Sequence, residues 1–327
     1  MNLAILGAGA WGTALAIVLS QRHQTVLWVW DPDQLAEMQA NRSSRFLPNF
    51  SLPASVQLHA KVEGALAQAD LAIVVVPMQG LRQTLKEIRQ SAKSVSVILA
   101  CKGFEPGSPN LPHQVAAQEL AAGTPRAILS GPSFAQEVAQ GLPAALTLAS
   151  NDVAFAQTAA KELHSQKLRI YSNDDVIGAA VGGAVKNVMA IAAGICDGMG
   201  LGNNARAALI TRGLAEITRL GLKLGGKPET FMGLAGAGDL VLTCTGDLSR
   251  NRQVGIMLAA GKSLPVILEQ LGHVAEGVPT AREVLQLARK VGVDMPITRA
   301  VNQVLYENVP AQTALQELLN RDPKAEF

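Results

Sequence analysis

The chain has 327 residues, of which 48% are hydrophobic and 17% are charged, and its formal net charge at pH 7 is +2. Single hydrophobic cores rarely grow beyond about 300 residues, so this length favours two domains. A nearly neutral chain without blocks of like charge argues against nucleic acid as a partner. Its three cysteines are widely separated, which argues against a disulfide framework or a zinc site and favours the reducing cytoplasm.

No membrane span is expected either. The most hydrophobic long stretch, residues 176–201, contains Lys186, Asn187 and Asp197, whereas a membrane-spanning helix carries few or no charges. We therefore predict a buried helix of a soluble protein. The apolar N-terminus has no basic flank ahead of it and is broken by glycines, so it does not read as a signal peptide. No spacing of metal ligands is found, and no metal is expected.

The first dozen residues predict a dinucleotide-binding loop. A short apolar run, residues 3–6, suits a buried strand, and residues 13–19 suit a helix. Between them lie three glycines at the G-x-G-x-x-G spacing: Gly7, Gly9 and Gly12. In this context the glycines allow a tight turn, the approach of a pyrophosphate and close packing of helix on strand. A second apolar strand, residues 25–30, ends at Asp31, as this motif requires.

Strands and helices then alternate. Further strands are predicted at residues 56–59, 71–76, 95–100, 127–129, 144–148 and 168–171. Helices are predicted at residues 32–39, 81–89, 111–121 and 153–164, and residues 41–53 are predicted to form a loop. Such alternation indicates a largely parallel sheet with helices on both faces.

The pattern changes near Asp174. From there on no strand is predicted, and residues 205–224, 281–291 and 297–305 carry apolar side chains at helical spacing. The predicted fold is thus an N-terminal Rossmann-type doubly wound α/β sheet followed by an all-α C-terminal domain. We place the dinucleotide-binding domain at residues 1–175 and the helical, substrate-binding domain at residues 176–327.

Several polar residues stand where ligands would bind. Ligands of doubly wound sheets lie beyond the carboxyl ends of the strands. Lys102 follows one predicted strand and the stretch Gly131-Pro132-Ser133-Phe134 follows another. Position alone leaves Lys102 open between a ligand contact and a solvated surface group.

Lys186 is more distinctive, because it interrupts an apolar helical stretch. Burial would lower its pKa and suit it to acid–base chemistry on a hydroxyl group. The alternative is a lysine whose stem is buried and whose head reaches water.

Further along, Ser249 is expected to cap a helix that begins near Asn251, and Arg250 beside it could hold a phosphate. Arg250 could equally be a surface arginine. Asp239 could pair with Lys186, bind a substrate hydroxyl or only cap a helix, and Glu276 could be only a first-turn acid.

In this order, these stretches closely resemble the bacterial-type NAD(P)-dependent glycerol-3-phosphate dehydrogenases. The matching segments are GAGAWGTALA, CKGFE, SGPSFAQEVAQGLP, GGAVKN, GLAGAGDLVLTCTGDLSRNRQVG and VAEGVPTAREV, which together extend from the first strand to about residue 286. The resemblance implies interconversion of sn-glycerol 3-phosphate and dihydroxyacetone phosphate by hydride transfer, and a supply of glycerol 3-phosphate for phospholipid synthesis. It also implies a helical second domain that completes the active site, and a homodimer.

The resemblance implies a role for each matching residue. Lys186 would be the general acid and base. The substrate would contact Lys102, Gly131, Ser133, Lys186, Asp239, Ser249, Arg250 and Asn251. The cofactor would contact the glycine loop together with Ala10, Trp11, Trp30, Lys102, Ala135, Arg250, Val274 and Glu276.

One departure from the family concerns the choice of cofactor. Members often carry arginine just after the second strand, where this chain has Trp30 and Asp31. Because Arg42 and Arg45 in the following loop could supply the missing charge, we expect NAD and NADP both to be used. Two other readings stay open: a related dehydrogenase acting on a hydroxyacid, and a non-catalytic protein that senses dinucleotides.

Overall fold

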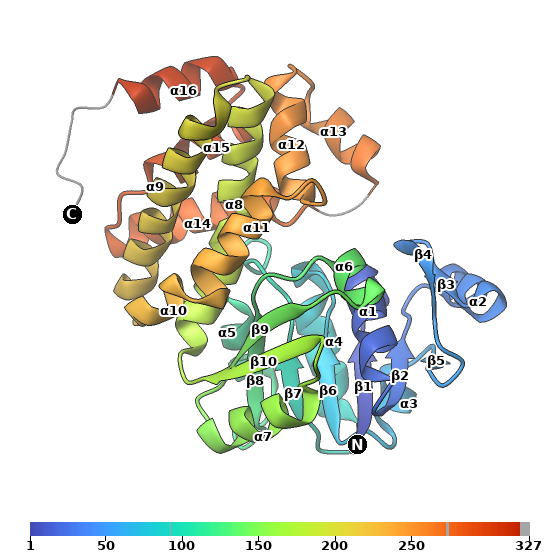
Figure 1. Cartoon of the computed structure of the whole chain (residues 1–327). Helices are drawn as coiled ribbons and strands as arrows, with labels where there is room; N and C mark the ends of the chain where they lie inside the picture. Colours follow the sequence, from blue (N-terminus) through green and yellow to red (C-terminus); the bar gives the residue numbers. More distant parts are fainter. Residues whose placement is uncertain (92, 273–274, 321–327) are drawn as a thin grey trace.

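The computed structural model describes residues 1–91, 93–272 and 275–320. Its main sheet is built from β1 (Asn2–Leu6), β2 (Gln24–Trp28), β5 (Gln57–His59), β6 (Leu71–Val74), β7 (Ser96–Leu99), β8 (Arg126–Ser130), β9 (Ala144–Ala149) and β10 (Leu168–Asn173). The strand order is β10-β9-β8-β7-β6-β1-β2-β5 (Figure 1). Neighbouring strands are parallel except β8 and β9, which confirms the largely parallel sheet and shows that its last two strands are reversed.

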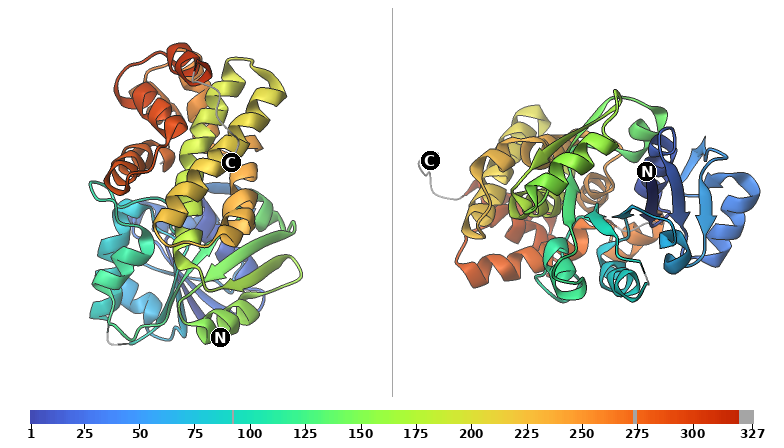
Figure 2. Two further views of the ribbon diagram at one scale, coloured as in Figure 1. Left: turned by 90° about the vertical axis from the view of Figure 1, so that its left-hand side faces the viewer. Right: turned by 90° about the horizontal axis from the view of Figure 1, so that it is seen from below.

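Alternate side chains of the central strands enter two different cores. In β1, Leu3 and Ile5 pack in one core and Ala4 and Leu6 in the other, as the two-residue period of a strand requires. The first core is completed by α1 (Ala10–Leu19), α6 (Ala135–Gln140) and α7 (Val153–Leu163). The second is completed on the opposite face by α3 (Val62–Leu66), α4 (Met78–Gln90) and α5 (Pro112–Glu119), as the view from below in Figure 2 shows.

The prediction of a loop at residues 41–53 was wrong in part. After α2 (Pro32–Asn41), the chain forms an antiparallel hairpin of β3 (Ser43–Ser44) and β4 (Leu47–Ser51). Leu47 and Leu52 are buried in the same core as α1, so packing overrides the polar composition and the prolines of this stretch. The second strand is also shorter than predicted and leaves Trp30 outside it.

In the described residues after Asn173, every regular element is helical, which confirms the prediction for the second half. These elements are α8 (Val176–Gly198), α9 (Gly202–Lys223), α10 (Pro228–Met232), the π-helical turn η1 (Leu234–Gly238), α11 (Asp239–Thr245), α12 (Arg250–Ala259), α13 (Leu264–Leu271), α14 (Gly277–Val291), α15 (Pro296–Tyr306) and α16 (Ala311–Leu319). They lie over the end of the sheet toward which β1 points (Figure 1).

Helix α8 is the centre of this helical half. Among the described helices it alone is long and apolar enough to cross a membrane, yet 94% of its most apolar stretch is buried inside the fold. Its side chains share one continuous core with α14 and with one face of the sheet. The prediction of a buried helix is confirmed, and this helix holds Lys186 over the carboxyl ends of the strands.

Candidate active site

The glycine loop has the shape that a dinucleotide needs. Gly7 has φ of +125°, and a Cβ atom there would lie 2.9 Å from the carbonyl oxygen of Val75. A Cβ atom on Gly12 would lie 1.8 Å from the carbonyl oxygen of Gly7, whereas one on Gly9 would meet no atom within 4 Å. Packing therefore demands two of the glycines, and the third leaves the backbone open to a ligand.

The start of α1 completes this loop. The helix begins at Ala10 and Trp11, and no side chain caps its N-terminus. Its first N–H groups and the positive end of its dipole can therefore meet a pyrophosphate. These residues fit the NAD(P) that the sequence implies.

The acidic residue that follows the second strand, Asp31, is engaged in capping the next helix. Trp30 is 71% exposed. The Asp31 carboxylate accepts hydrogen bonds from the backbone N–H groups of Asp33 and Gln34, at 2.9 and 3.1 Å, and so caps α2. Its orientation is set by this capping role.

The two nearby arginines have different surroundings. Arg42 donates to the carbonyl oxygens of Pro53 and Val56, so its guanidinium is held by the turn that follows the hairpin. Arg45 is 40% exposed and pairs with Glu37 at 3.0 Å, with Asp31 at 4.0 Å. Of the two arginines considered for cofactor charge, Arg45 is the exposed one.

Two glycines bring the catalytic candidates together. A Cβ atom on Gly182 would lie 2.4 Å from the carbonyl oxygen of Ala235, so η1 can sit directly on α8. A Cβ atom on Gly183 would lie 2.8 Å from Ser130 Oγ, so α8 also touches the end of β8. One turn further along α8, Lys186 meets Asp239, the residue that follows η1. Such π-helical turns are frequent at functional sites.

One carboxylate joins two lysines at this point. Lys186 Nζ donates to Asp239 Oδ1 and, at 2.8 Å, to Thr243 Oγ1. Lys102 Nζ donates to Asp239 Oδ2 at 2.7 Å and to the carbonyl oxygen of Gly131 at 3.1 Å. Of the alternatives left open for Asp239, the structure shows the pairing with Lys186. An ammonium group has three donors, so each lysine keeps one N–H for a ligand.

Burial lowers the pKa of Lys186. The side chain of Lys186 is 8% exposed and that of Asp239 is 1% exposed. Desolvation, with some help from the charge of Lys102, outweighs the attraction of Asp239 and lowers the pKa of Lys186 to about 8. The competition between burial and Asp239, which the sequence leaves undecided, thus ends in favour of burial. An amine with a pKa near neutrality can both give and take a proton at physiological pH.

The start of α12 forms the opposite wall. Ser249 caps this helix by accepting from the N–H of Arg252, which confirms the predicted cap. Arg250 is exposed at the first position of the helix. Asn251 is buried and bridges two other helices: its Nδ2 donates to Asn187 Oδ1 at 3.0 Å, and its Oδ1 accepts from the N–H of Gly277 at 2.9 Å.

The remaining candidates surround the same region. Ser133 Oγ donates to the carbonyl oxygen of Gly131 at 3.1 Å, and Ala135 begins α6. Burial raises the pKa of Glu276 to about 7, although its carboxylate faces the backbone N–H of Met78 at the start of α4 and the charge of Arg250. Val274 lies outside the described residues.

Sequence reasoning missed Thr243 as part of this cluster. It links to the catalytic candidates twice, because its hydroxyl accepts from Lys186 and donates to the carbonyl oxygen of Asp239 at 2.6 Å. The signal was present in the spacing: residues 239 and 243 are four apart and share one face of a helix. Asn187 was likewise seen only as the neighbour of Lys186.

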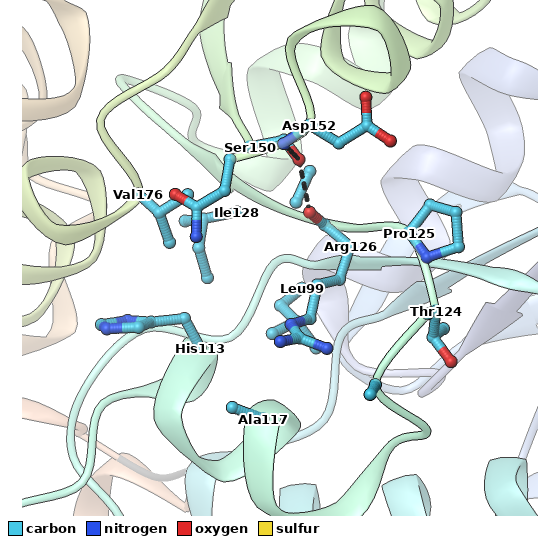
Figure 3. A pocket seen from close by; sticks show the side chains of 14 residues that line it. Leu99, His113, Ala117, Thr124, Pro125, Arg126, Ile128, Ser150, Asp152 and Val176 are labelled. Atoms are coloured by element: carbon cyan, nitrogen blue, oxygen red, sulfur yellow. Dashed lines mark hydrogen bonds between the residues drawn. The ribbon is translucent and has the colours of Figure 1, made fainter.

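A separate pocket, of about 290 Å³, lies beside β7 and β8 (Figure 3). His113, Arg126, Ser150 and Asp152 are among its lining residues. Arg126 begins β8, whereas Gly131 follows the end of that strand. Leu99 and Ile128, which also line the pocket, lie three residues before Lys102 and Gly131, or roughly 10 Å along the strands. None of the residues that line the pocket belongs to the lysine cluster.

In the part of the chain that the structure describes, no group of three or more His, Cys, Asp or Glu side chains gathers in a way that could hold a metal ion. The cysteines Cys101, Cys196 and Cys244 are buried and unpaired.

Comparisons with known proteins cover nearly the whole chain. Residues 2–156 match the family described as NAD-dependent glycerol-3-phosphate dehydrogenase N-terminus, and residues 175–316 match the corresponding C-terminus. A protein of Nitrosospira multiformis called glycerol-3-phosphate dehydrogenase [NAD(P)+] is 60% identical, over 100% of both chains. The crystal structure of glycerol-3-phosphate dehydrogenase from Coxiella burnetii is 43% identical, with a TM-score of 0.94 over 98% of this chain and 99% of that one.

A more distant likeness extends to the fold alone. D-mandelate dehydrogenase with NADH is 15% identical, with a TM-score of 0.63 over 94% of this chain and 98% of that one. The chain belongs to the NAD-dependent glycerol-3-phosphate dehydrogenase family.

Proposed function

We propose that this protein interconverts sn-glycerol 3-phosphate and dihydroxyacetone phosphate with NAD(H) or NADP(H). The observation that carries the proposal is Lys186, a buried amine with two of its three N–H groups held by Asp239 and Thr243. The third is left for the oxygen atom of a substrate. The bound nicotinamide would supply or accept the hydride, and the protein provides orientation and proton transfer.

Lys186 is the general acid when the ketone is reduced. As hydride reaches the carbonyl carbon, the oxygen gains negative charge, and the ammonium group of Lys186 donates a proton to it. In the reverse direction the neutral amine takes the proton from the hydroxyl group. Lys102 adds a second positive charge from the sheet side, held to the same carboxylate at 2.7 Å. Both charges favour the developing alkoxide.

Arg250 and the start of α12 are the proposed phosphate grip. The guanidinium can make two parallel hydrogen bonds to a phosphate. The N-terminus of the helix adds the attraction of its dipole. Binding the phosphate there would fix the carbonyl carbon beside Lys186. Gly131, Ser133, Ser249 and Asn251 are proposed to complete the substrate site.

The cofactor is proposed to bind across the carboxyl ends of the strands. The glycine loop with Ala10 and Trp11 would hold the pyrophosphate, and Lys102 and Glu276 would lie at the nicotinamide end. β1 and β7 are separated only by β6, so about 10 Å separate the loop from the strand that precedes Lys102. Trp30, Ala135, Arg250 and Val274 are proposed as further contacts. Residues 1–175 and 176–327 are proposed as the two domains that meet here.

The physiological setting is also a proposal. We infer a cytoplasmic homodimer that supplies glycerol 3-phosphate for phospholipid synthesis. Three unpaired cysteines suit a reducing compartment. Large apolar side chains are exposed on helices of the second half, including Met232 at 71% and Val241 at 48%, and such surfaces often mark contacts between subunits. Analytical ultracentrifugation should give twice the chain mass.

One assay tests the proposed activity. The purified protein is mixed with dihydroxyacetone phosphate and either NADH or NADPH, and the loss of nicotinamide absorbance is followed. Turnover is expected with this substrate and not with a 2-oxo acid of similar size. Preferential turnover of the 2-oxo acid would instead show a hydroxyacid dehydrogenase. Cofactor binding without any turnover would show a dinucleotide sensor.

A further inference from the structure

Helix α12, which carries the proposed phosphate grip, lies in direct backbone contact with α8. A Cβ atom on Gly194 of α8 would lie 2.0 Å from the carbonyl oxygen of Arg252. A Cβ atom on Gly255 of α12 would lie 2.1 Å from the carbonyl oxygen of Ile191. The two helices therefore share one close crossing, which fixes their separation. Glycine contacts of this kind do not by themselves fix the direction of the chain entering α12.

The side chain of Arg252 supplies that second constraint. Its Nε donates to Asp197 Oδ2 at 2.7 Å, at the end of α8. Its Nη1 donates to Asp247 Oδ1 at 2.9 Å, in the turn that precedes α12. Its backbone N–H donates to Ser249 Oγ at 3.3 Å. One residue thus ties the end of α8, the preceding turn and the cap of α12 together.

The Arg252–Asp197 pair is only slightly exposed, whereas Asp247 is 96% exposed. The side chain of Arg252 is 12% exposed and that of Asp197 is 14% exposed, so water screens their attraction only partly. Asp197 lies eleven residues beyond Lys186 on α8, or about 16 Å along the helix. Asp197 therefore does not reach a substrate bound at Lys186, and the guanidinium of Arg252 is directed to Asp197 and Asp247.

We propose that Arg252, held by Asp197, is a positioning residue for phosphate recognition. It holds the turn Ser249-Arg250-Asn251 at a fixed place along α8, and hence at a fixed distance from Lys186. Asn251 contacts Asn187, the neighbour of Lys186, from the same turn. The inference rests on the proposed function, because it concerns how that site grips its phosphate. A small displacement of such a group can slow a reaction by about 10- to 100-fold without any loss of contact.

The structure offers a matched control on the same carboxylate. Arg206 of α9 donates from Nη1 to both oxygens of Asp197, at 3.1 and 3.2 Å. Neither of these two hydrogen bonds of Arg206 involves the turn before α12. Arg206→Gln therefore weakens the same cluster of charges from the side of α9, whereas Arg252→Gln weakens it from the side of α12.

The experiment compares two substrates that differ only in the phosphate. For the wild type, Arg252→Gln and Arg206→Gln, kcat and KM are measured with dihydroxyacetone phosphate and, at high enzyme concentration, with dihydroxyacetone. Arg252→Gln should lower kcat/KM for dihydroxyacetone phosphate by about 10- to 100-fold, mainly through KM. It should leave dihydroxyacetone, which has no phosphate to grip, nearly unchanged. Arg206→Gln should change neither substrate by more than about threefold, within the usual range of surface substitutions.

Two results would overturn the proposal. If Arg252→Gln lowers the rates with both substrates by the same factor, its role is general stability. If it lowers neither, the anchor is irrelevant to the phosphate. Should Arg252→Gln fail to fold, Asp197→Asn and Arg252→Lys, which each keep part of the hydrogen bonding, must show the same selective rise in KM. A wild type that does not reduce dihydroxyacetone phosphate would reject the proposed function itself, whatever the variants do.

Discussion

Replacing Lys186 with alanine removes the proposed acid and base, and the structure sets the size of the effect. The substitution deletes the N–H group left for the substrate together with the bonds to Asp239 and Thr243. Loss of a positioned general acid or base costs about 10²- to 10⁴-fold in rate, or about 2.7 to 5.4 kcal/mol in activation free energy. We expect kcat to fall by at least about 10²-fold in both directions. Lys186→Arg should not restore it, because a guanidinium stays protonated.

The pH dependence of the wild type gives an independent reading of the same group. With its pKa lowered to about 8, Lys186 is protonated below that pH. For ketone reduction, kcat/KM should therefore be level at lower pH and fall as pH rises through about 8. For glycerol 3-phosphate oxidation it should rise with pH and level off above about 8. Both dependences should vanish in Lys186→Ala.

The assay measures kcat and kcat/KM in both directions, with cofactor affinity determined separately by fluorescence titration. Lys227, an exposed lysine that pairs with Asp174, provides the control: Lys227→Ala should leave kcat unchanged. Since the glycine loop lies on the other side of the site, Lys186→Ala should bind the cofactor normally. Retained kcat with weakened cofactor binding would refute the assignment, and the proton would have to pass through Lys102 or water.

Three further expectations concern the rest of the protein. Arg250→Ala should lower kcat/KM for dihydroxyacetone phosphate by about 2 to 5 kcal/mol, the scale of a desolvated charge pair that loses one partner, and Arg250→Lys should recover only part; near-normal kinetics of the alanine variant would disprove the phosphate grip. Both cofactors should be used, and Arg45→Gln should weaken NADPH more than NADH; a preference of more than about a thousandfold, roughly 4 kcal/mol, would rule out dual use. Glu216 is 1% exposed, and burial raises its pKa to about 7. Its contribution to the free energy of unfolding is therefore fully present below about pH 4.5, its ordinary pKa, and is lost as pH rises through about 7. Denaturant titrations should show a loss of about 3 kcal/mol across this window, and Glu216→Gln should abolish that loss.

The order and type of the elements could be predicted because their signals are local. The first nineteen residues predict the cofactor loop, because they contain a buried strand, three glycines and a helix. Ser249 likewise indicates the start of α12. The hairpin of β3 and β4 could not be predicted in this way. Its strands are short, and it is stabilised by burying Leu47 and Leu52 against α1 and its neighbours, which are remote in sequence.

The site residues also divide into those with a local signal in the sequence and those placed by contacts between remote segments. Periodicity singled out Lys186 as an unusual lysine, but it could not show that Gly182 lets η1 rest on α8 and so brings Asp239 within reach. Nor could it show that Asp31 is already engaged as the cap of α2. The first fact depends on two backbone segments, at Gly182 and Ala235, that are more than fifty residues apart in the sequence. The second depends on which hydrogen-bond donors the carboxylate of Asp31 accepts from. The role of Arg252 is of this kind too, because its partners lie on two different segments.

The carboxylate of Asp239 also constrains how such an enzyme can evolve. It joins Lys102, which follows a strand, to Lys186, which lies on a helix of the other half. The pKa of Lys186, the proposed catalytic amine, is therefore set partly by the charge of Lys102, some eighty residues earlier in the chain. Consider a recombinant protein that takes its sheet from one relative and its helices from another. It keeps the pKa of Lys186 only if both relatives have the pairing of Asp239 with Lys102 and Lys186. The two halves are therefore coupled by this carboxylate as well as by the core that α8 shares with the sheet.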